Sequence, residues 1–416
     1  MRRILVVLPF YGGSLPIGRY CAEALRSLGC VVEVFDAPGF FGAYTAIKEL
    51  KVALEKQEQL QSGFITLISR AVLAKVEHFD PDLVLAMAQA PLDRQTLMRL
   101  RKDGVPTAMW FVEDFRLFTY WQTFAPYYDI FAVIQKEPFL EKLAALGVSN
   151  TLYLPLAAMP SIHRPLELTP AERALFGSDI SFMGAGYPNR RTAFRHLARR
   201  NFKIWGTEWE GDTELAPLVQ RAGERISTED TVRIFNASRI NLNLHSSINA
   251  QPPVSEGDFV NPRTFEIAAC GAFQLVDKRG LLAELFDPED VAVFDSLDAL
   301  MQKIDYFLAR PEEREAFAAR GRKVVLERHT YTQRMRSLLD FARAVLPARD
   351  RQPAAWPDNL PESLKKDLAA LLDTAGLPPS ADFDTVVAGL RSRQGNLAPL
   401  ETALLFLDEW KKYYLR

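Results

Sequence analysis

Residues 261–276, NPRTFEIAACGAFQLV, decide the fold of the second half of the chain because they join a helix start, a carboxylate and a buried strand. Pro262 suits the first turn of a helix, where its missing N–H would have no intrahelical partner. The small residues at 268–271 then permit a tight turn before the apolar run 273–276. We predict a loop, a short helix, a turn and a strand, with Glu266 on the helix where a ligand can reach it.

A second acidic residue precedes this unit. Asp258 lies eight residues before Glu266, so the two carboxylates have an acidic-x7-acidic spacing. The alternative is an ordinary helix-to-strand crossover in which Glu266 is a solvated helix residue, because helix–Gly–strand units are common in α/β proteins.

A glycine- and arginine-rich loop follows an earlier strand, in the segment FMGAGYPNRR at 182–191. Glycines let backbone amides approach a ligand, a helix N-terminus favours anions, and guanidinium groups suit phosphate oxygens. The alternative is a surface turn with solvated arginines. The residues assigned to phosphate binding are Gly184, Gly186, Asn189, Arg190 and Arg191.

Two further strand ends carry candidate binding groups. The segment IWGTEW at 204–209 places Trp205, Gly206 and Trp209 where two indoles can hold a nucleobase. The alternative is that Trp205 belongs to the core and Trp209 merely covers it. Asn241, Asn243 and His245 alternate along the strand expected at 240–244, so they share one face. Buried polar groups need hydrogen-bond partners, which a ligand or the core itself can supply for His245.

The first half of the chain offers two candidate features. Gly12 and Gly13 follow the first strand, in the segment YGGS at 11–14. Asp114 ends the strand segment WFVEDF at 110–115, and ligands bind outside the carboxyl ends of strands in open parallel sheets. A carboxylate there suits a general base if burial raises its pKa. The alternative is that Asp114 caps the next turn.

Length and composition exclude several classes of protein. A chain of 416 residues predicts two to three domains, and 50 basic against 52 acidic residues argue against nucleic acid as the main partner. Three cysteines without metal-site spacing predict no disulfide framework and a reducing, cytoplasmic location. The apolar run at 4–10 is short for a signal segment and predicts a first strand. No apolar stretch approaches the length of a spanning helix.

Strands alternate with helical patterns twice along the chain. The first half reads as strands near 4–8, 31–35, 83–87, 107–112, 130–134 and 151–154, with one long helical stretch at 46–78. A Pro-containing linker near 157–170 precedes a second alternating block, and another linker spans 347–361. We therefore predict an α/β fold of two tandem Rossmann-like domains, at 1–158 and 159–346, with a linker and a small helical appendage at 347–416.

These motifs resemble those of GT-B glycosyltransferases, and most closely the CgeB-like family related to spore-maturation proteins, over about residues 1–345. The resemblance implies a donor site in the second domain, where the helix N-terminus faces a nucleoside diphosphate and Glu266 holds the ribose hydroxyls. Arg263 and Thr264, in the first turn of that helix, are assigned to the same site. Asp258 takes the first place of the family's E-x7-E signature, one methylene shorter than Glu. The resemblance also places the Gly12–Gly13 loop against donor phosphate and acceptor.

The expected function is transfer of a sugar from a nucleotide donor to an acceptor hydroxyl in the interdomain cleft, with Asp114 and Asp258 as catalytic residues. The resemblance implies no cofactor and no metal, because basic groups and helix dipoles neutralise the leaving diphosphate. The donor is expected to be UDP-, GDP- or dTDP-linked, and the acceptor a glycan, a lipid-linked sugar or a protein. Two alternatives share the fold: a sugar-nucleotide epimerase and a catalytically silent nucleotide-binding scaffold. The C-terminal helices are expected to form a packing or oligomerisation module.

Overall fold

The computed structural model describes residues 3–347, 360–393 and 395–414. Contacts between residues group the chain into two compact units. The first unit contains residues 3–111, 123–131 and the described part of 339–416, and the second contains 112–122 and 132–338. The loops that follow two strands of the first sheet therefore belong to the second unit. The domain boundaries expected from the sequence stay a prediction.

The first sheet has six strands in the order β2-β1-β3-β4-β5-β6. β1 pairs in parallel with β2 and β3, and β3 pairs in parallel with β4. β1, β3 and β4 form because their apolar runs are buried on both faces, as parallel sheets covered by helices require. The strands are β1 Arg3–Val7, β2 Val31–Phe35, β3 Leu83–Met87, β4 Thr107–Phe111, β5 Ile130–Val133 and β6 Thr151–Tyr153.

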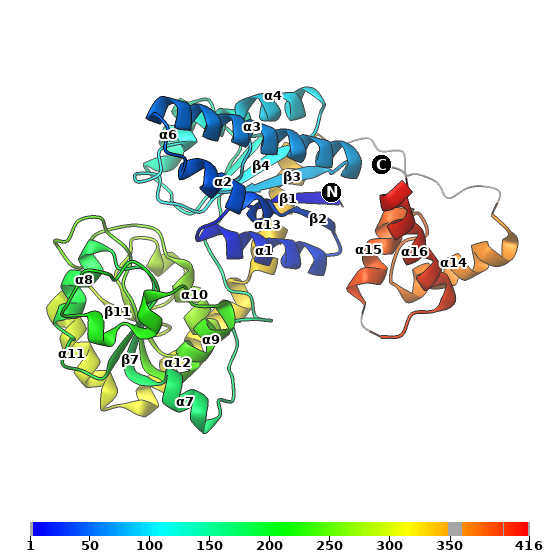
Figure 1. The fold of residues 1–416 in the computed structure, drawn as a ribbon. Helices are drawn as coiled ribbons and strands as arrows, with labels where there is room; N and C mark the ends of the chain where they lie inside the picture. Colours follow the sequence, from blue (N-terminus) through cyan, green and yellow to red (C-terminus); the bar gives the residue numbers. More distant parts are fainter. Residues whose placement is uncertain (1–2, 348–359, 394, 415–416) are drawn as a thin grey trace. The chain divides into compact units, whose positions relative to one another are not determined.

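Helices connect the strands of the first sheet (Figure 1). The helical stretch expected at 46–78 is wrong as a single helix, because the structure has two helices separated near residues 49–53. The side chain of Asp93 caps α4 by accepting a hydrogen bond from Thr96 N at 2.8 Å. The helices of this region are α1 Ser14–Ser27, α2 Phe41–Lys48, α3 Leu54–Phe79, α4 Arg94–Lys102, α5 Trp121–Phe124 and α6 Phe139–Ala145, with short 3₁₀ turns at Ala37–Phe40 and Ala125–Tyr127.

The second sheet has five strands in the order β11-β10-β9-β7-β8, and all four pairings are parallel. Its strand positions confirm the second alternating block expected from the sequence. The strands are β7 Ser178–Met183, β8 Phe202–Trp205, β9 Ser238–Asn243, β10 Gln274–Asp277 and β11 Ala292–Phe294.

Alternating side chains of the second sheet enter two apolar cores. Phe182 packs with residues of α8 and α11 in one core, while its neighbour Met183 packs with residues of α9 and α10 in the other. The sheet is thus covered on both faces, which confirms the expected doubly wound arrangement. The helices are α7 Pro170–Phe176, α8 Pro188–Arg195, α9 Thr228–Ala237, α10 Pro262–Ala269, α11 Leu297–Leu308 and α12 Pro311–Arg328, with 3₁₀ turns at Ala216–Leu218, Gln220–Gly223 and Leu282–Glu284.

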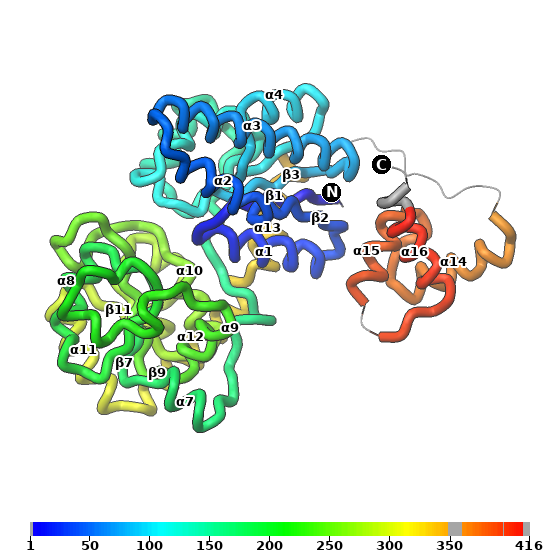
Figure 2. The backbone as a smooth tube through the Cα atoms, viewed as in Figure 1, coloured from blue at the N-terminus to red at the C-terminus, as the bar shows by residue number. Residues whose placement is uncertain are grey.

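The chain continues through α13 (Tyr331–Val345) to three C-terminal helices, which Figure 2 traces. These helices are α14 (Glu362–Thr374), α15 (Phe383–Ser392) and α16 (Pro399–Tyr414). They share a small apolar core that contains Leu368, Val386 and Leu404. The predicted linker at 347–361 lies almost entirely outside the described residues.

Two sequence-based expectations concern the chain as a whole. In the described part of the chain, no helix is both long and apolar enough to cross a membrane. Cys21, Cys30 and Cys270 are free cysteines, and Cys21 and Cys270 are buried.

Candidate functional site

The carboxyl edge of the second sheet has a topological switch point at β7, which pairs with β8 on one side and with β9 on the other. Ligands of open parallel sheets bind outside the carboxyl ends of the strands at such a point. The loop after β7 begins at Gly184 and the loop after β9 begins at Leu244. The predicted glycine–arginine segment and His245 therefore lie at this edge.

Glycines allow the loops after β7 and β8 to touch. A Cβ on Gly186 would lie 2.1 Å from the carbonyl oxygen of Glu208, and a Cβ on Gly206 would lie 2.7 Å from that of Gly184. Gly206 also has a φ of +115°, which side chains of L-residues rarely adopt. The sequence singled out these glycines for ligand approach, and the structure gives them a second role in packing loop against loop.

Asn189 joins the loops after β7 and β9. Its side-chain nitrogen donates to His245 O at 2.9 Å and to Pro253 O at 3.1 Å, and its oxygen accepts from Ser247 N at 2.8 Å. Every polar atom of this buried amide therefore has a backbone partner, so its role in the structure is to fix the two loops.

Arg190 and Arg191 also bind backbone carbonyls. Arg190 is buried, and it donates from Nε to Leu244 O and from NH1 to Ala185 O, both at 2.9 Å. Burial lowers the pKa of Arg190 to about 10, so it stays charged at neutral pH. Arg191 donates to Gly186 O at 2.7 Å and to Glu210 O at 3.0 Å. Phosphate contact by either guanidinium stays a prediction.

Both tryptophans of the predicted nucleobase rim are core side chains. Trp205 is 1% exposed and packs with the α9–α10 core, while Trp209 is 2% exposed and packs with the opposite core. Trp209 Nε1 donates to Gly184 O at 3.0 Å. Trp205 is therefore a core residue, as the alternative proposed, but Trp209 packs in the opposite core and does not cover it.

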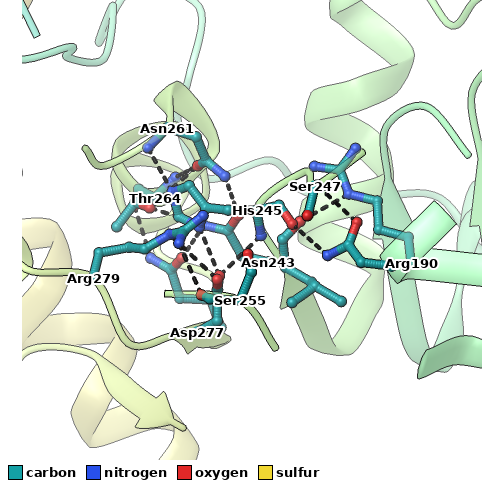
Figure 3. A network of polar contacts seen from close by, with 12 residues as sticks. Arg190, Asn243, His245, Ser247, Ser255, Asn261, Thr264, Asp277 and Arg279 are labelled. Atoms are coloured by element: carbon teal, nitrogen blue, oxygen red, sulfur yellow. Dashed lines mark hydrogen bonds and ion pairs between the residues drawn. The ribbon is translucent and has the colours of Figure 1, made fainter. Parts of the chain in front are cut away.

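His245 forms a buried pair with Asp277, the last residue of β10 (Figure 3). Its Nδ1 lies 2.6 Å from Asp277 Oδ1, and its Nε2 accepts a hydrogen bond from the backbone N–H of Asn261 at 2.9 Å. Because Nε2 is an acceptor, the proton of the neutral ring lies on Nδ1 and is donated to Asp277. Burial lowers the pKa of His245 to about 4, so the ring is neutral near pH 7.

Asn261 caps α10, the helix that carries Glu266. Its side-chain oxygen accepts from Thr264 N at 3.2 Å, and its side-chain nitrogen donates to Asn243 Oδ1 at 2.7 Å. Asn243 in turn donates to Thr264 Oγ1 at 2.9 Å and to Gln274 Oε1 at 3.2 Å. The predicted site residue Thr264 is fully buried and thus holds the helix start to β9 and β10.

Arg279 lies on the other side of Asp277. Its Nε is 3.3 Å from Asp277 Oδ2, and its NH1 donates to Ser255 O at 3.0 Å. A Cβ on Gly257 would come within 2.2 Å of Arg279 NH1, so only glycine leaves room for the guanidinium there. Burial lowers the pKa of Arg279, and the charge of Asp277 opposes that shift.

Asp258 has one engaged and one unengaged oxygen. Oδ1 accepts from Gln135 Nε2 and from Phe259 N, both at 2.8 Å, and lies 3.7 Å from Arg116 NH1. All of these residues belong to the second unit. Asp258 Oδ2 is buried and has no hydrogen-bond partner among the residues that the structure describes. A ligand hydroxyl would satisfy this oxygen, as buried polar atoms require.

Glu266 is a buried carboxylate on α10. Its Oε2 binds Arg263 NH1, and its Oε1 lies 3.9 Å from His163 Nε2. Burial raises the pKa of Glu266, but Arg263 and the neighbouring His163 outweigh this effect, so the pKa lies below its ordinary value. Glu266 is therefore an ionised acceptor at neutral pH, and the solvated-helix alternative does not describe it.

The loop after β1 lies at the switch point of the first sheet, because β1 pairs with β2 on one side and β3 on the other. Gly12 has a φ of +101° and Gly13 is the N-cap residue of α1. Ser14 Oγ donates to Ala88 O at 3.1 Å and so connects this loop to the end of β3. The predicted glycine loop is thus at a ligand-accessible edge of the first sheet.

Asp114 is half-buried in the loop after β4. Its Oδ1 accepts from Arg116 N at 2.9 Å, which is the turn-capping arrangement that the sequence left as an alternative. Tyr120 OH binds the adjacent Glu113 at 2.7 Å, so the two acidic residues of this loop have different partners. The structure leaves the general-base role of Asp114 a prediction.

Three residues of the network were missed by reasoning from the sequence: His163, Asp277 and Arg279. Asp277 and Gln274 are polar residues within an otherwise apolar strand, which is a signal that the sequence does contain. His163 Nδ1 accepts from Met159 N at 3.0 Å, so its Nε2–H points to the Glu266 side. Nothing in the local sequence places residue 163 beside residue 266.

No group of three or more His, Cys, Asp or Glu side chains is arranged to hold a metal ion among the residues that the structure describes. The expected metal independence is a separate question about the reaction and stays a prediction.

Comparison with known proteins shows which fold this chain shares. Residues 190–340, which include β8 to β11 and nearly all of the network, match the family model described as glycosyl transferase-like. Sucrose-phosphate synthase from Thermosynechococcus elongatus has a similar fold, with a TM-score of 0.56 at 15% identity over 83% of this chain and 99% of that one. HepE from Anabaena, solved in complex with UDP and glucose, has a TM-score of 0.57 at 11% identity over 83% of this chain and 100% of that one. The chain thus shares the GT-B fold of these structures, as its motifs predicted, and its residues 190–340 are similar to glycosyl transferase-like proteins.

A curated relative sharpens this assignment. The chain is 27% identical to the spore protein CgeB of Bacillus subtilis over 281 residues, which are 63% of this chain and 83% of the relative. The expected resemblance to CgeB-like proteins is therefore confirmed.

Proposed function

We propose that this protein is a nucleotide-sugar-dependent glycosyltransferase whose donor binds at the carboxyl edge of the second sheet. The observation that carries the proposal is α10: a capped helix N-terminus, with a buried and ionised Glu266, at the same edge as the loops after β7 and β9. A helix N-terminus favours a phosphate, and a carboxylate accepts hydrogen bonds from two neighbouring hydroxyls. The match of residues 190–340 to a glycosyl transferase-like family supports the same reading.

The proposed donor is a nucleoside diphosphate sugar, with UDP as the first candidate because HepE was solved with UDP. Glu266 would accept hydrogen bonds from the ribose hydroxyls once the Arg263 side chain moves away from the carboxylate, or while Arg263 still binds one of its oxygens. Arg263 is the cation best placed to contact the diphosphate, because its side chain is only partly buried while that of Arg190 is enclosed. The unpartnered Oδ2 of Asp258 would accept from a hydroxyl of the transferred sugar.

In the proposed reaction, the bond between the anomeric carbon and the diphosphate oxygen breaks, and the acceptor oxygen bonds to that carbon. The leaving diphosphate gains negative charge, which the α10 N-terminus and Arg263 would stabilise without a resident metal. The acceptor hydroxyl loses its proton, and we propose Asp114 as the group that receives it. The acceptor is a glycan, a lipid-linked sugar or a protein.

The fold alone does not separate a transferase from the epimerase that shares it, so the test must follow products. The full chain is first screened by thermal shift with UDP, GDP and dTDP, because a ligand of the native state raises the melting temperature. It is then incubated with the matching nucleotide sugars. Slow release of the free nucleoside diphosphate is the expected result. Interconversion of the sugar without release would indicate an epimerase, binding without turnover a scaffold, and no thermal shift would contradict the proposal.

A further inference from the structure

One buried carboxylate, Asp277, connects to both ends of the segment that precedes α10. It is fully buried at the end of β10, and its two oxygens face different partners. Oδ1 binds the Nδ1 and the backbone N–H of His245, at 2.6 and 2.9 Å. Oδ2 lies 3.3 Å from Arg279 Nε. Figure 3 shows the two side chains on either side of this carboxylate.

The first connection runs through His245 to Asn261. Asp277 accepts the Nδ1 proton and thereby leaves Nε2 of the neutral ring as an acceptor. Nε2 then accepts the backbone N–H of Asn261 at 2.9 Å. Asn261 is the N-cap of α10, so the place where that helix begins depends on this ring.

The second connection runs through Arg279 to Ser255. The guanidinium donates to Ser255 O at 3.0 Å and occupies the space that a side chain on Gly257 would need. Backbone bonds extend this contact, because Gly280 N donates to Gly257 O and Leu281 N donates to Asp258 O, both at 2.9 Å. The segment is therefore held at 255–258 as well as at 261.

We propose that Asp277 is a positioning residue of the donor site, which fixes residues 255–261 through His245 at one end and Arg279 at the other. This inference rests on the proposed function, because the segment contains Asp258 and precedes α10, the helix that carries Glu266. Asp277 itself is fully buried, so it acts through His245 and Arg279. Its negative charge matters because a neutral replacement takes from the buried guanidinium of Arg279 its strongest counter-charge and leaves only the weaker effects of Asp258 and Asp114.

The direct test is Asp277→Asn in the full chain, followed by hydrogen-exchange mass spectrometry without any ligand. We expect peptides that cover 255–261 to exchange at least ten times faster, while peptides of β7 remain unchanged. Asp212→Asn is the matched control, because Asp212 is also buried and bound to an arginine, Arg195 at 3.0 Å, while its other side-chain hydrogen bond is to Leu215 N, outside this segment. Unchanged exchange at 255–261 would overturn the proposal, and so would faster exchange throughout the chain.

The two connections can be tested separately if Asp277→Asn does not fold. His245→Phe removes the acceptor for Asn261 N–H, whereas His245→Gln retains one donor and one acceptor and should restore much of the protection at 261. Gly257→Ala displaces Arg279 and should loosen 255–258 while the exchange at 261 changes less. Equal effects of the Phe and Gln variants on Asn261 would contradict the first connection.

Titration with UDP, or with whichever nucleoside diphosphate gives the thermal shift, supplies the functional readout. We expect Asp277→Asn to weaken binding at least tenfold and Asp212→Asn to leave it within twofold. A failure of nucleotide binding by the wild-type chain would reject the proposed function but not the exchange result. Faster exchange at 255–261 with unchanged nucleotide affinity would overturn the positioning role and leave the proposed function intact.

Discussion

The carboxyl edges of the two sheets have the same topology but different chemistry. At the edge of the second sheet, buried asparagine, histidine, aspartate and arginine side chains bind one another and the loop backbones. At the edge of the first sheet, Gly12 and Gly13 lie beside the exposed rings of Tyr11 and Phe41, whose centroids are 4.9 Å apart. We infer that the polar side chains at the edge of the second sheet are already held in place before a donor binds. The loop after β1, at the edge of the first sheet, carries glycines and exposed aromatic rings instead.

The largest expected effect concerns Asp114, at the edge of the first sheet. Asp114→Asn should lower turnover by about 10²- to 10⁴-fold, which is the usual contribution of a general base, and leave nucleotide affinity nearly constant. Steady-state kinetics with the true acceptor and calorimetry with the nucleotide measure the two quantities. Glu113→Gln is the neighbouring control, since Glu113 binds Tyr120 and has no assigned role. Wild-type turnover in a folded Asp114→Asn protein would reject the base assignment.

The second prediction concerns pH and the buried histidines of the second unit. His245 has a pKa of about 4 in the folded chain against 6.5 ordinarily, because burial disfavours its charged form. Between these values the unfolded chain binds more protons than the native one, so stability falls as the pH drops from 6.5 to 4. His245 alone should account for about 3 kcal/mol of this loss. His329, whose pKa burial also lowers to about 4, should add to it.

Urea unfolding at several pH values measures this dependence. His245→Gln should flatten the curve between pH 6.5 and 4, whereas His78→Gln, at an exposed position on α3 of the first unit, should not. An unchanged slope in His245→Gln would show that the ring is not the group that titrates.

Glu266→Ala should weaken nucleotide binding by roughly 2–3 kcal/mol if the carboxylate holds two hydroxyls through charged hydrogen bonds. The exposed Glu229 of α9 offers a control at the same sheet without contact to the network. Titration calorimetry measures both variants after circular dichroism has confirmed the fold. Wild-type affinity in Glu266→Ala would remove this residue from the site.

The smallest effect compares two helix caps, one from each unit. Asn261→Ala and Asp93→Ala should each reduce the free energy of unfolding by about 1 kcal/mol, because each removes an acceptor for a helix N–H. Only Asn261→Ala should also weaken nucleotide binding. Equal nucleotide affinity in the two variants would break the distinction between the donor edge and the rest of the fold.

Local sequence patterns predicted the fold well because strands and helix starts are encoded by nearby residues. The unit at 261–276 formed as expected: Pro262 opens α10, and the strand that contains Val276 follows the turn. The interruption between α2 and α3 has no glycine or proline to signal it, so the pattern predicted one continuous helix. The predicted helical appendage includes α15, whose start is marked by the N-cap pair Asp382 and Thr385.

The site was only partly predictable because its network depends on tertiary contacts. Asp277 and His245 are 32 residues apart in sequence, and parallel pairing of β9 and β10 brings their ends together. The roles of Arg190 and Trp209 were equally hidden, since nothing local shows that one binds carbonyls of the loops and the other packs beneath them. Sequence patterns indicated which groups are polar or aromatic, and only the fold shows which of them face each other.

Hydrogen exchange of the full chain, with and without the nucleoside diphosphate that gives a thermal shift, tests the donor-site assignment. We expect the nucleotide to slow exchange at the carboxyl edge of the second sheet, in peptides that cover 184–190, 244–247 and 255–266. We expect smaller changes in the loops after β1 and β3, at 8–14 and 88–93. Protection confined to these first-sheet loops, with none at 255–266, would contradict the assignment of the donor site.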